Sequence, residues 1–223
     1  MIGTLICSIG ALFYCYEFIL RATPGIMVQD LMGAYRVSAE TIGLLSTCYY
    51  FLYTPLQLPA GILMDKYGPR LLLTGSVILC TIGSLLMYLS MDIMFSSIAQ
   101  VIIGAGSAFA FVGAMKLAAN WIPERHFALF SGITTTLGMI GAVGADTGLL
   151  QLLGKIGWQH VWLLLAAIGL LLCGTMYLFV QDGPERSGLA QHRNHKVKRE
   201  HKTWHDFYRA VKHILVNRTF WLN

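Results

Sequence analysis

Two oppositely charged residues, Glu17 and Arg21, stand in the first apolar run of the chain. Their spacing of four residues places both on one face of a helix, where a carboxylate and a guanidinium can pair. Charged groups at membrane depth are costly, and they usually face a cavity where they bind ions, protons or charged solutes. One interpretation makes Arg21 a solute-binding cation and Glu17 its partner or a proton site. The other has Arg21 reaching the outer surface, with Glu17 as a local counter-ion.

Hydrogen-bonding side chains gather in the second apolar run, where they either line a pathway or pack as aromatics. We take Tyr49 and Tyr50 as candidate solute contacts, and Tyr53 and Gln57 extend the same polar stretch. Asn120 is a weaker candidate, because a helix cap explains it equally well.

Two further charged residues leave alternatives open. Asp146, in the outer part of the fifth apolar run, is either a proton or cation site or an aspartate in water at the outer edge. Lys116, near the inner end of the fourth run, either reaches the inner surface or makes a solute or gating contact.

A charged turn, GILMDKYGPR at 61–70, lies between the second and third apolar runs. Its glycines, Gly61 and Gly68, permit a positive-φ turn and close helix approach. Asp65 can cap or bridge to a neighbouring helix end, and Arg70 suits the cytoplasmic face.

The elements that carry these residues are membrane-spanning helices. The chain is 56% hydrophobic and 12% charged, whereas a soluble domain has roughly 25% charged residues. Uncharged or nearly uncharged runs long enough to cross a bilayer predict an all-α membrane protein with six spans, at about 1–20 (or through Pro24), 41–63, 71–90, 95–119, 127–150 and 160–180.

Connections between the predicted spans are polar. A hairpin at about 28–40 contains Ser38, a plausible N-cap for the second span, and a loop through Gly157 precedes the sixth. In the fifth span Gly138, Gly141 and Gly144 recur every three residues, which predicts one side open to close helix contact.

The segment after the sixth span has a different composition. Between Gln181 and Arg218 it holds nine Lys and Arg residues, and the apolar residues from Trp204 to Leu215 follow helical spacing. We divide the chain into a six-helix bundle (1–180), a basic cytoplasmic segment with an amphipathic helix on the inner leaflet (181–218) and the start of a truncated seventh span (219–223).

Charge and composition also narrow the function classes. The net charge of +5 comes from loops beside the membrane and from the basic segment, which is the positive-inside pattern with a cytoplasmic N-terminus, so we predict lipid and not nucleic acid as the partner of these charges. The cysteines supply no metal spacing, and there is no nucleophile elbow or phosphate loop. We therefore predict no metal, no cofactor and no enzymatic activity.

The turn at 61–70 resembles the loop motif G-x-L-x-D-x-x-G-x-R of the major facilitator superfamily, carried here by Gly61, Asp65, Gly68 and Arg70. The resemblance implies that these four residues control conformational change at the cytoplasmic face. The stretch from Tyr16 to Arg21, followed by Pro24, is similar to the first span of its organic anion and sugar phosphate branch and of bacterial phagosomal nutrient transporters.

This resemblance implies the N-terminal half of a transporter, built from two three-helix repeats, that moves a small polar or anionic organic solute across the inner (plasma) membrane by alternating access. It implies that Arg21 binds a phosphate or carboxylate, and that a C-terminal half or a homodimer completes the pathway. Where the family usually has an arginine in the fourth span, this chain has Gln100. The alternative is a membrane-bound adaptor that has lost transport and binds partners through its basic tail.

Overall fold

A computed structural model describes residues 2–183, and within them every regular element is a helix. The helices are α1 (Ile2–Ile26), α2 (Val28–Tyr35), α3 (Ala39–Tyr67), α4 (Pro69–Leu89), α5 (Ile93–Ser107), α6 (Ala110–Trp121) and α7 (Glu124–Phe179). The predicted amphipathic helix of the basic segment and the start of a seventh span lie outside the described residues.

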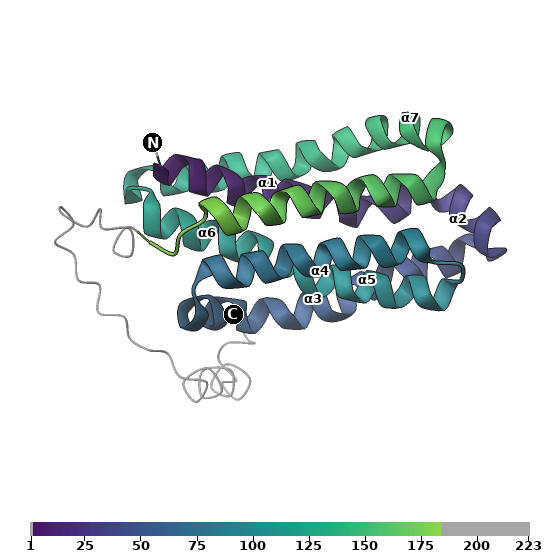
Figure 1. Cartoon of the computed structure of the whole chain (residues 1–223), viewed down its shortest axis with the longest axis horizontal. Helices are drawn as coiled ribbons and strands as arrows, with labels where there is room; N and C mark the ends of the chain where they lie inside the picture. The colour runs from purple at the N-terminus through teal and green to yellow at the C-terminus, as the bar shows by residue number, and fades with distance from the viewer. Residues whose placement is uncertain (1, 184–223) are drawn as a thin grey trace, which may run out of the picture.

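The long helices lie side by side as a bundle (Figure 1). The chain runs back and forth along the length of this bundle. The passes are α1, α3, α4, α5 with α6, and the two parts of α7, which folds back at Gly157 (φ 79°, ψ 161°). Without a bend, the 56 residues of α7 would form a helix about 84 Å long. The bend at Gly157 divides α7 into two shorter passes instead. The predicted all-α fold with six spans is confirmed.

Four described stretches are long and apolar enough to cross a membrane: α1, α4, residues 93–121 and α7. The protein is thus a multi-pass membrane protein. The 29-residue α3 is long enough to cross as well, but its tyrosines, Gln57 and two prolines make it less apolar than the other long helices. Ser38 caps it as predicted, accepting a hydrogen bond from the Thr41 amide.

Three connections differ from the prediction. Residues 28–35 form α2 instead of part of a hairpin, because Met27 and Leu31 are buried against the bundle. The fourth span is broken between α5 and α6, where the Phe109 amide donates to the carbonyl three residues back. The predicted loop through Gly157 shrinks to a single non-helical residue.

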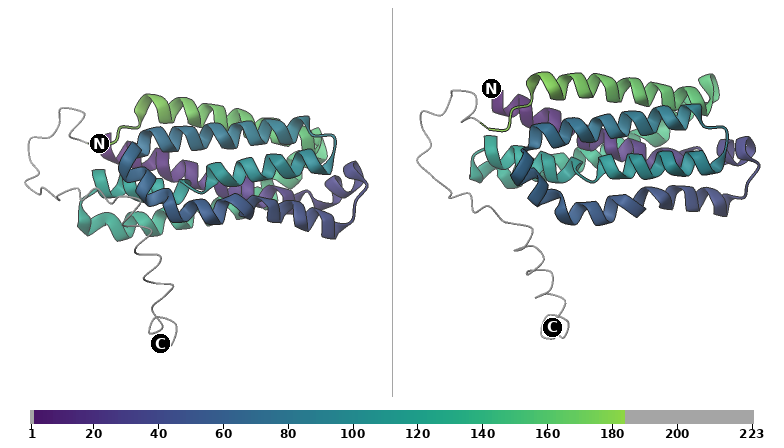
Figure 2. Two further views of the ribbon diagram at one scale, coloured as in Figure 1. Left: turned by 90° about the horizontal axis from the view of Figure 1, so that it is seen from below. Right: turned by 60° about the horizontal axis from the view of Figure 1, so that its bottom comes forward.

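The connections gather at two opposite ends of the bundle. One end, which we call the loop end, holds the α3–α4 turn, the α6–α7 turn and residues 180–183, and the start of α1 lies there too (Figure 2). The other end holds α2, the α4–α5 turn and the point where α7 folds back (Figure 1). The basic turns predicted to be cytoplasmic therefore share one end.

Glycines set how closely the helices approach. A Cβ on Gly104 would lie 1.9 Å from the Tyr49 carbonyl oxygen, so α5 touches the backbone of α3 there. Gly138 and Gly141 pack in the same way against Tyr14 and Cys15 of α1. Gly144 meets nothing within 4 Å. The prediction that all three α7 glycines line one contact side is wrong, because residues six apart on a helix differ by about 120° around its axis.

Replacing Gly104 by alanine should lower the thermal stability of the purified protein by about 1–3 kcal/mol, because the added methyl group overlaps backbone that cannot rotate away. Gly144→Ala is the matched control and should be neutral or stabilising by up to about 1 kcal/mol. Melting curves in detergent measure both. Equal melting temperatures for the two variants would contradict the close approach of α5 to α3.

Candidate functional site

Glu17 and Arg21 form the centre of the candidate site, on α1. Glu17 is 0% exposed, and Arg21 Nη1 lies 3.8 Å from its Oε1 atom across one helical turn. The Tyr49 hydroxyl donates a short hydrogen bond to the same Oε1 atom from α3. The ion pair expected from the four-residue spacing is therefore present, and its acidic member is held from a second helix.

Arg21 is only partly enclosed. Its guanidinium lies 3.9 Å from the centre of the Phe18 ring, and its side chain is 25% exposed. Among the described residues its contacts are this ring and the Glu17 carboxylate. A guanidinium has five N–H donors in a planar fork that matches a carboxylate or phosphate, so Arg21 keeps donors available for an anion.

The second oxygen of Glu17 has no hydrogen-bond partner in the part of the chain that the structure describes. Oε2 is buried and accepts no hydrogen bond from the described residues. An unsatisfied buried acceptor costs about 1–3 kcal/mol, and a proton or a small donor at this atom would reduce that cost. The carboxylate is thus paired on one oxygen and open on the other.

The three tyrosines of α3 form one cluster with different exposures. Tyr49 stacks on Tyr53 with ring centres 5.1 Å apart, and Tyr50 meets both rings edge-on. Tyr49 is 1% exposed and Tyr50 is 46% exposed. Of the two predicted solute contacts, Tyr49 has its hydroxyl committed to Glu17, whereas Tyr50 is open. Solute binding by either residue stays a prediction.

The residues of the 61–70 turn separate into distinct roles at the loop end. Asp65 forms a salt bridge with Lys116 of α6, so Lys116 contacts the turn. Arg70 donates from Nη2 to the Tyr177 carbonyl at 2.7 Å. Gly68 has φ +85° and is a required glycine, but Gly61 has open space around it. The gating role of these residues stays a prediction.

Sequence reasoning missed the partners that follow α7. Asp182 accepts a hydrogen bond from the Arg70 amide, and its carbonyl accepts one from Asn120 Nδ2. Trp121 Nε1 donates to the Gln181 carbonyl. The available signal in the sequence is Asp182, an acidic residue directly after the sixth apolar run. From the sequence alone we place this residue in the basic segment. Asn120 binds this segment here instead of capping its own helix.

Two other polar residues, Asp146 and Gln100, have different environments. Asp146 is exposed on the first part of α7, and no contact ties it to Glu17. Gln100 is fully buried in α5, and both atoms of its side-chain amide lack partners among the described residues.

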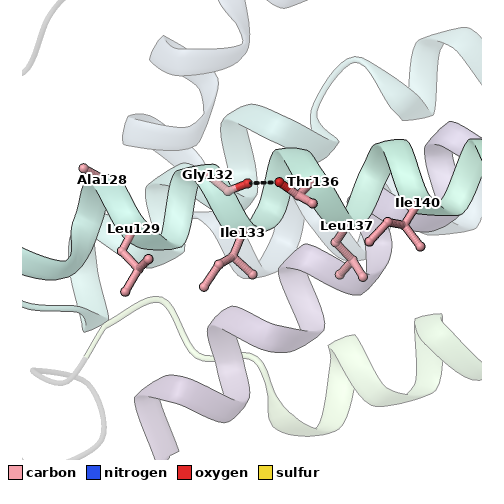
Figure 3. Close-up of a pocket in the computed structure, with 7 residues that line it drawn as sticks. All are labelled: Ala128, Leu129, Gly132, Ile133, Thr136, Leu137 and Ile140. Atoms are coloured by element: carbon pink, nitrogen blue, oxygen red, sulfur yellow. Dashed lines mark hydrogen bonds between the residues drawn. The ribbon is translucent and has the colours of Figure 1, made fainter.

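An apolar groove on the first part of α7 contains none of the predicted site residues. It has a volume of about 460 Å³ and is lined by residues of that helix alone: Ala128, Leu129, Gly132, Ile133, Thr136, Leu137 and Ile140 (Figure 3). Its hydroxyl, Thr136 Oγ1, is bonded to the Gly132 carbonyl at 2.9 Å. The groove carries no charge and offers nothing to hold an anion.

Comparisons with a family model and with known proteins point to one family. Residues 7–222 match the family model described as Major Facilitator Superfamily. Relatives include a probable sulfoacetate transporter of Cupriavidus necator, 22% identical over 82% of this chain and 42% of its own length. A putative tartrate transporter of Agrobacterium vitis is 24% identical over 79% and 40%, and the hexuronate transporter of Bacillus subtilis is 24% identical over 77% and 40%. The chain thus spans about two fifths of these relatives.

A solved structure supports the fold. The crystal structure of a bacterial homolog of the human lysosomal transporter Spinster, in an inward-facing and unoccupied conformation, matches with a TM-score of 0.77 and 19% identity. The match covers 99% of this chain and 50% of that one.

Tyr49→Phe should destabilise the protein by about 1–3 kcal/mol, because it removes the donor to a buried carboxylate and leaves both Glu17 oxygens poorly satisfied. Tyr50→Phe removes a hydroxyl from an exposed ring and should change stability by less than about 0.5 kcal/mol. Thermal melts of the two variants in one detergent make the comparison. A neutral Tyr49→Phe would show that the hydrogen bond contributes nothing.

Proposed function

The chain belongs to the Major Facilitator Superfamily, and from that premise we propose that it forms the N-terminal half of a secondary transporter for a small polar or anionic organic solute. The solute moves by alternating access, in which two arrangements of the helices expose one site to either side of the membrane in turn. Arg21 is the solute-binding cation.

The observation that carries this proposal is the environment of Arg21. Its guanidinium is fixed in place by the Phe18 ring and the Glu17 carboxylate, yet a quarter of the side chain is exposed and donors are left over. A structural arginine in a membrane protein would have its donors occupied by buried acceptors. A positive group that is held firmly but incompletely paired suits an incoming carboxylate or phosphate.

The relatives support the same solute class. Sulfoacetate, tartrate and hexuronate, which their names give as solutes, are all organic anions. Because those relatives are more than twice as long as the matched region, we propose that a second six-helix half, or a second copy of this chain, supplies the other wall of the pathway. The inner membrane, with the loop end in the cytoplasm, is the proposed location.

Arg21→Gln should reduce uptake of an anionic solute by about 10- to 100-fold, since a charge-assisted hydrogen bond of about 1.5–3 kcal/mol is lost. Uptake into vesicles that contain this chain together with a C-terminal half provides the measurement, with a panel of radiolabelled mono- and dicarboxylates. Arg36→Gln, at an exposed turn after α2, is the matched control and should transport normally. Unchanged affinity in Arg21→Gln would rule out the binding role.

We also infer that Glu17 carries the coupling proton and Asp146 does not. Glu17→Gln should abolish uptake driven by a proton gradient while it preserves exchange of labelled for unlabelled solute, since exchange needs no net proton movement. Asp146→Asn should leave both activities intact. Loss of exchange in Glu17→Gln would instead make Glu17 a structural counter-ion of Arg21, and loss of gradient-driven uptake in Asp146→Asn alone would move the proton site to Asp146.

A further inference from the structure

The first turn of α4 has no cap of its own. Gly68, at the N-cap position, has no side chain to accept hydrogen bonds, and Pro69, at the next position, has no amide hydrogen. The Arg70 amide is therefore the first donor of α4 that needs an acceptor. Asp182, which follows α7 and is 112 residues away in sequence, supplies it through Oδ1 at 3.0 Å.

Gly68 is shaped around that carboxylate. A Cβ built on Gly68 would lie 2.5 Å from Asp182 Oδ1, closer than real Cβ atoms come to another atom, and 3.1 Å from Oδ2, which is a tight contact. The residue also has φ +85°, where side chains are strained. The motif glycine is therefore required twice, once by the backbone turn and once because the Asp182 side chain fills the space of a missing side chain.

Two more hydrogen bonds hold the segment at Gln181 and Asp182, and a third holds the last turn of α7 just before it. Asn120 Nδ2 donates to the Asp182 carbonyl at 2.7 Å, and Trp121 Nε1 donates to the Gln181 carbonyl at 3.1 Å. Arg70 Nη2 donates to the Tyr177 carbonyl at 2.7 Å, near the end of α7. The segment is bound on one side by the start of α4 and on the other by the end of α6.

We propose that Asp182 is a positioning residue that caps α4 from a distance and thereby locks the end of the sixth span to the 61–70 turn. The ends of α4, α6 and α7 then move together at the loop end. Its consequence for transport rests on the proposed function, but the cap itself does not.

The cap is tested by amide hydrogen exchange on the full chain in detergent. Asp182→Ala should speed exchange at residues 70–72 by about 2- to 30-fold, the range expected for loss of an N-cap. Asp182→Asn keeps the Oδ1 acceptor and should restore much of the protection. Asp92→Ala removes the local cap that Asp92 provides to the Phe95 amide, so it should speed exchange there and leave residues 70–72 unchanged. Unchanged exchange at 70–72 in Asp182→Ala overturns the proposal.

A double-mutant cycle tests the fit between the two side chains. Gly68→Ala should lower the melting temperature more in the native background than in Asp182→Ala, because only the native background contains the clashing carboxylate. The strain of the positive φ is common to both backgrounds and cancels. If Gly68→Ala lowers the melting temperature equally in the two backgrounds, the proposed fit is overturned. The comparison remains valid when Gly68→Ala melts at a much lower temperature than the native protein.

Transport kinetics separate a positioning role from solute binding. Gly3 of α1 lies against Trp121 at the loop end, and Glu17 is 14 residues further along the helix, or about 21 Å. Asp182→Ala in the complete transporter should therefore lower the turnover rate and leave the KM within about twofold. Native turnover, together with faster exchange at 70–72, overturns the coupling to transport. A native transporter that moves no anion contradicts the proposed function and leaves the exchange result to decide the cap.

Discussion

A buried carboxylate in the middle of α1 is the constraint on which the arrangement of this helical bundle depends. Glu17 is fully enclosed, and an ionised group in such a place needs a nearby positive charge and hydrogen-bond donors. Arg21 supplies the charge from the same helix and Tyr49 supplies the donor from α3. The first of these follows from local spacing, but the second requires α3 to lie at one distance and rotation relative to α1.

That position of α3 depends in turn on a glycine in a third helix. Gly104 lets α5 reach the backbone of α3 at Tyr49, the same residue whose hydroxyl binds Glu17. Any larger residue at Gly104 would push the Tyr49 backbone away from α5 and shift its hydroxyl. Gly104 has no polar side chain, yet it affects the hydrogen bond to Glu17 because it sets the position of Tyr49.

At the loop end the bundle is held by a different kind of contact. The salt bridge between Asp65 and Lys116 is about half exposed on its acidic side, and such pairs are typically worth only about 0–1 kcal/mol. Two backbone groups at helix ends, the Arg70 amide of α4 and the Tyr177 carbonyl of α7, are satisfied by the Asp182 carboxylate and by the Arg70 side chain. Asn120 binds the Asp182 carbonyl just beyond α7. We therefore assign most of the rigidity of this end to capping, and a role of the salt bridge in conformational change stays a prediction.

Local patterns predicted the six spans, the Ser38 cap and the pairing of Glu17 with Arg21, because apolar length, capping chemistry and four-residue spacing are all properties of short stretches. The partners of Glu17 on α3 and of Gly68 after α7 could not be predicted in this way, since each joins residues that only the packing of separate helices brings together. The fourth span was predicted as one helix, but it is interrupted at Ala108 and Phe109, and the predicted loop at Gly157 is a single non-helical residue.

Helix α3 joins the Glu17 site to the loop end, because it carries Tyr49 at the one and Asp65 at the other. These residues are 16 positions apart, or about 24 Å along the helix. Pro55 and Pro59 lie between them, and because proline has no amide hydrogen, the carbonyls of Phe51 and Pro55 receive no bond from these positions. The stretch of α3 between the site and the turn is thus the part least held by its own backbone. A bend there would change the position of Asp65 relative to Lys116 without breaking the hydrogen bond from Tyr49 to Glu17.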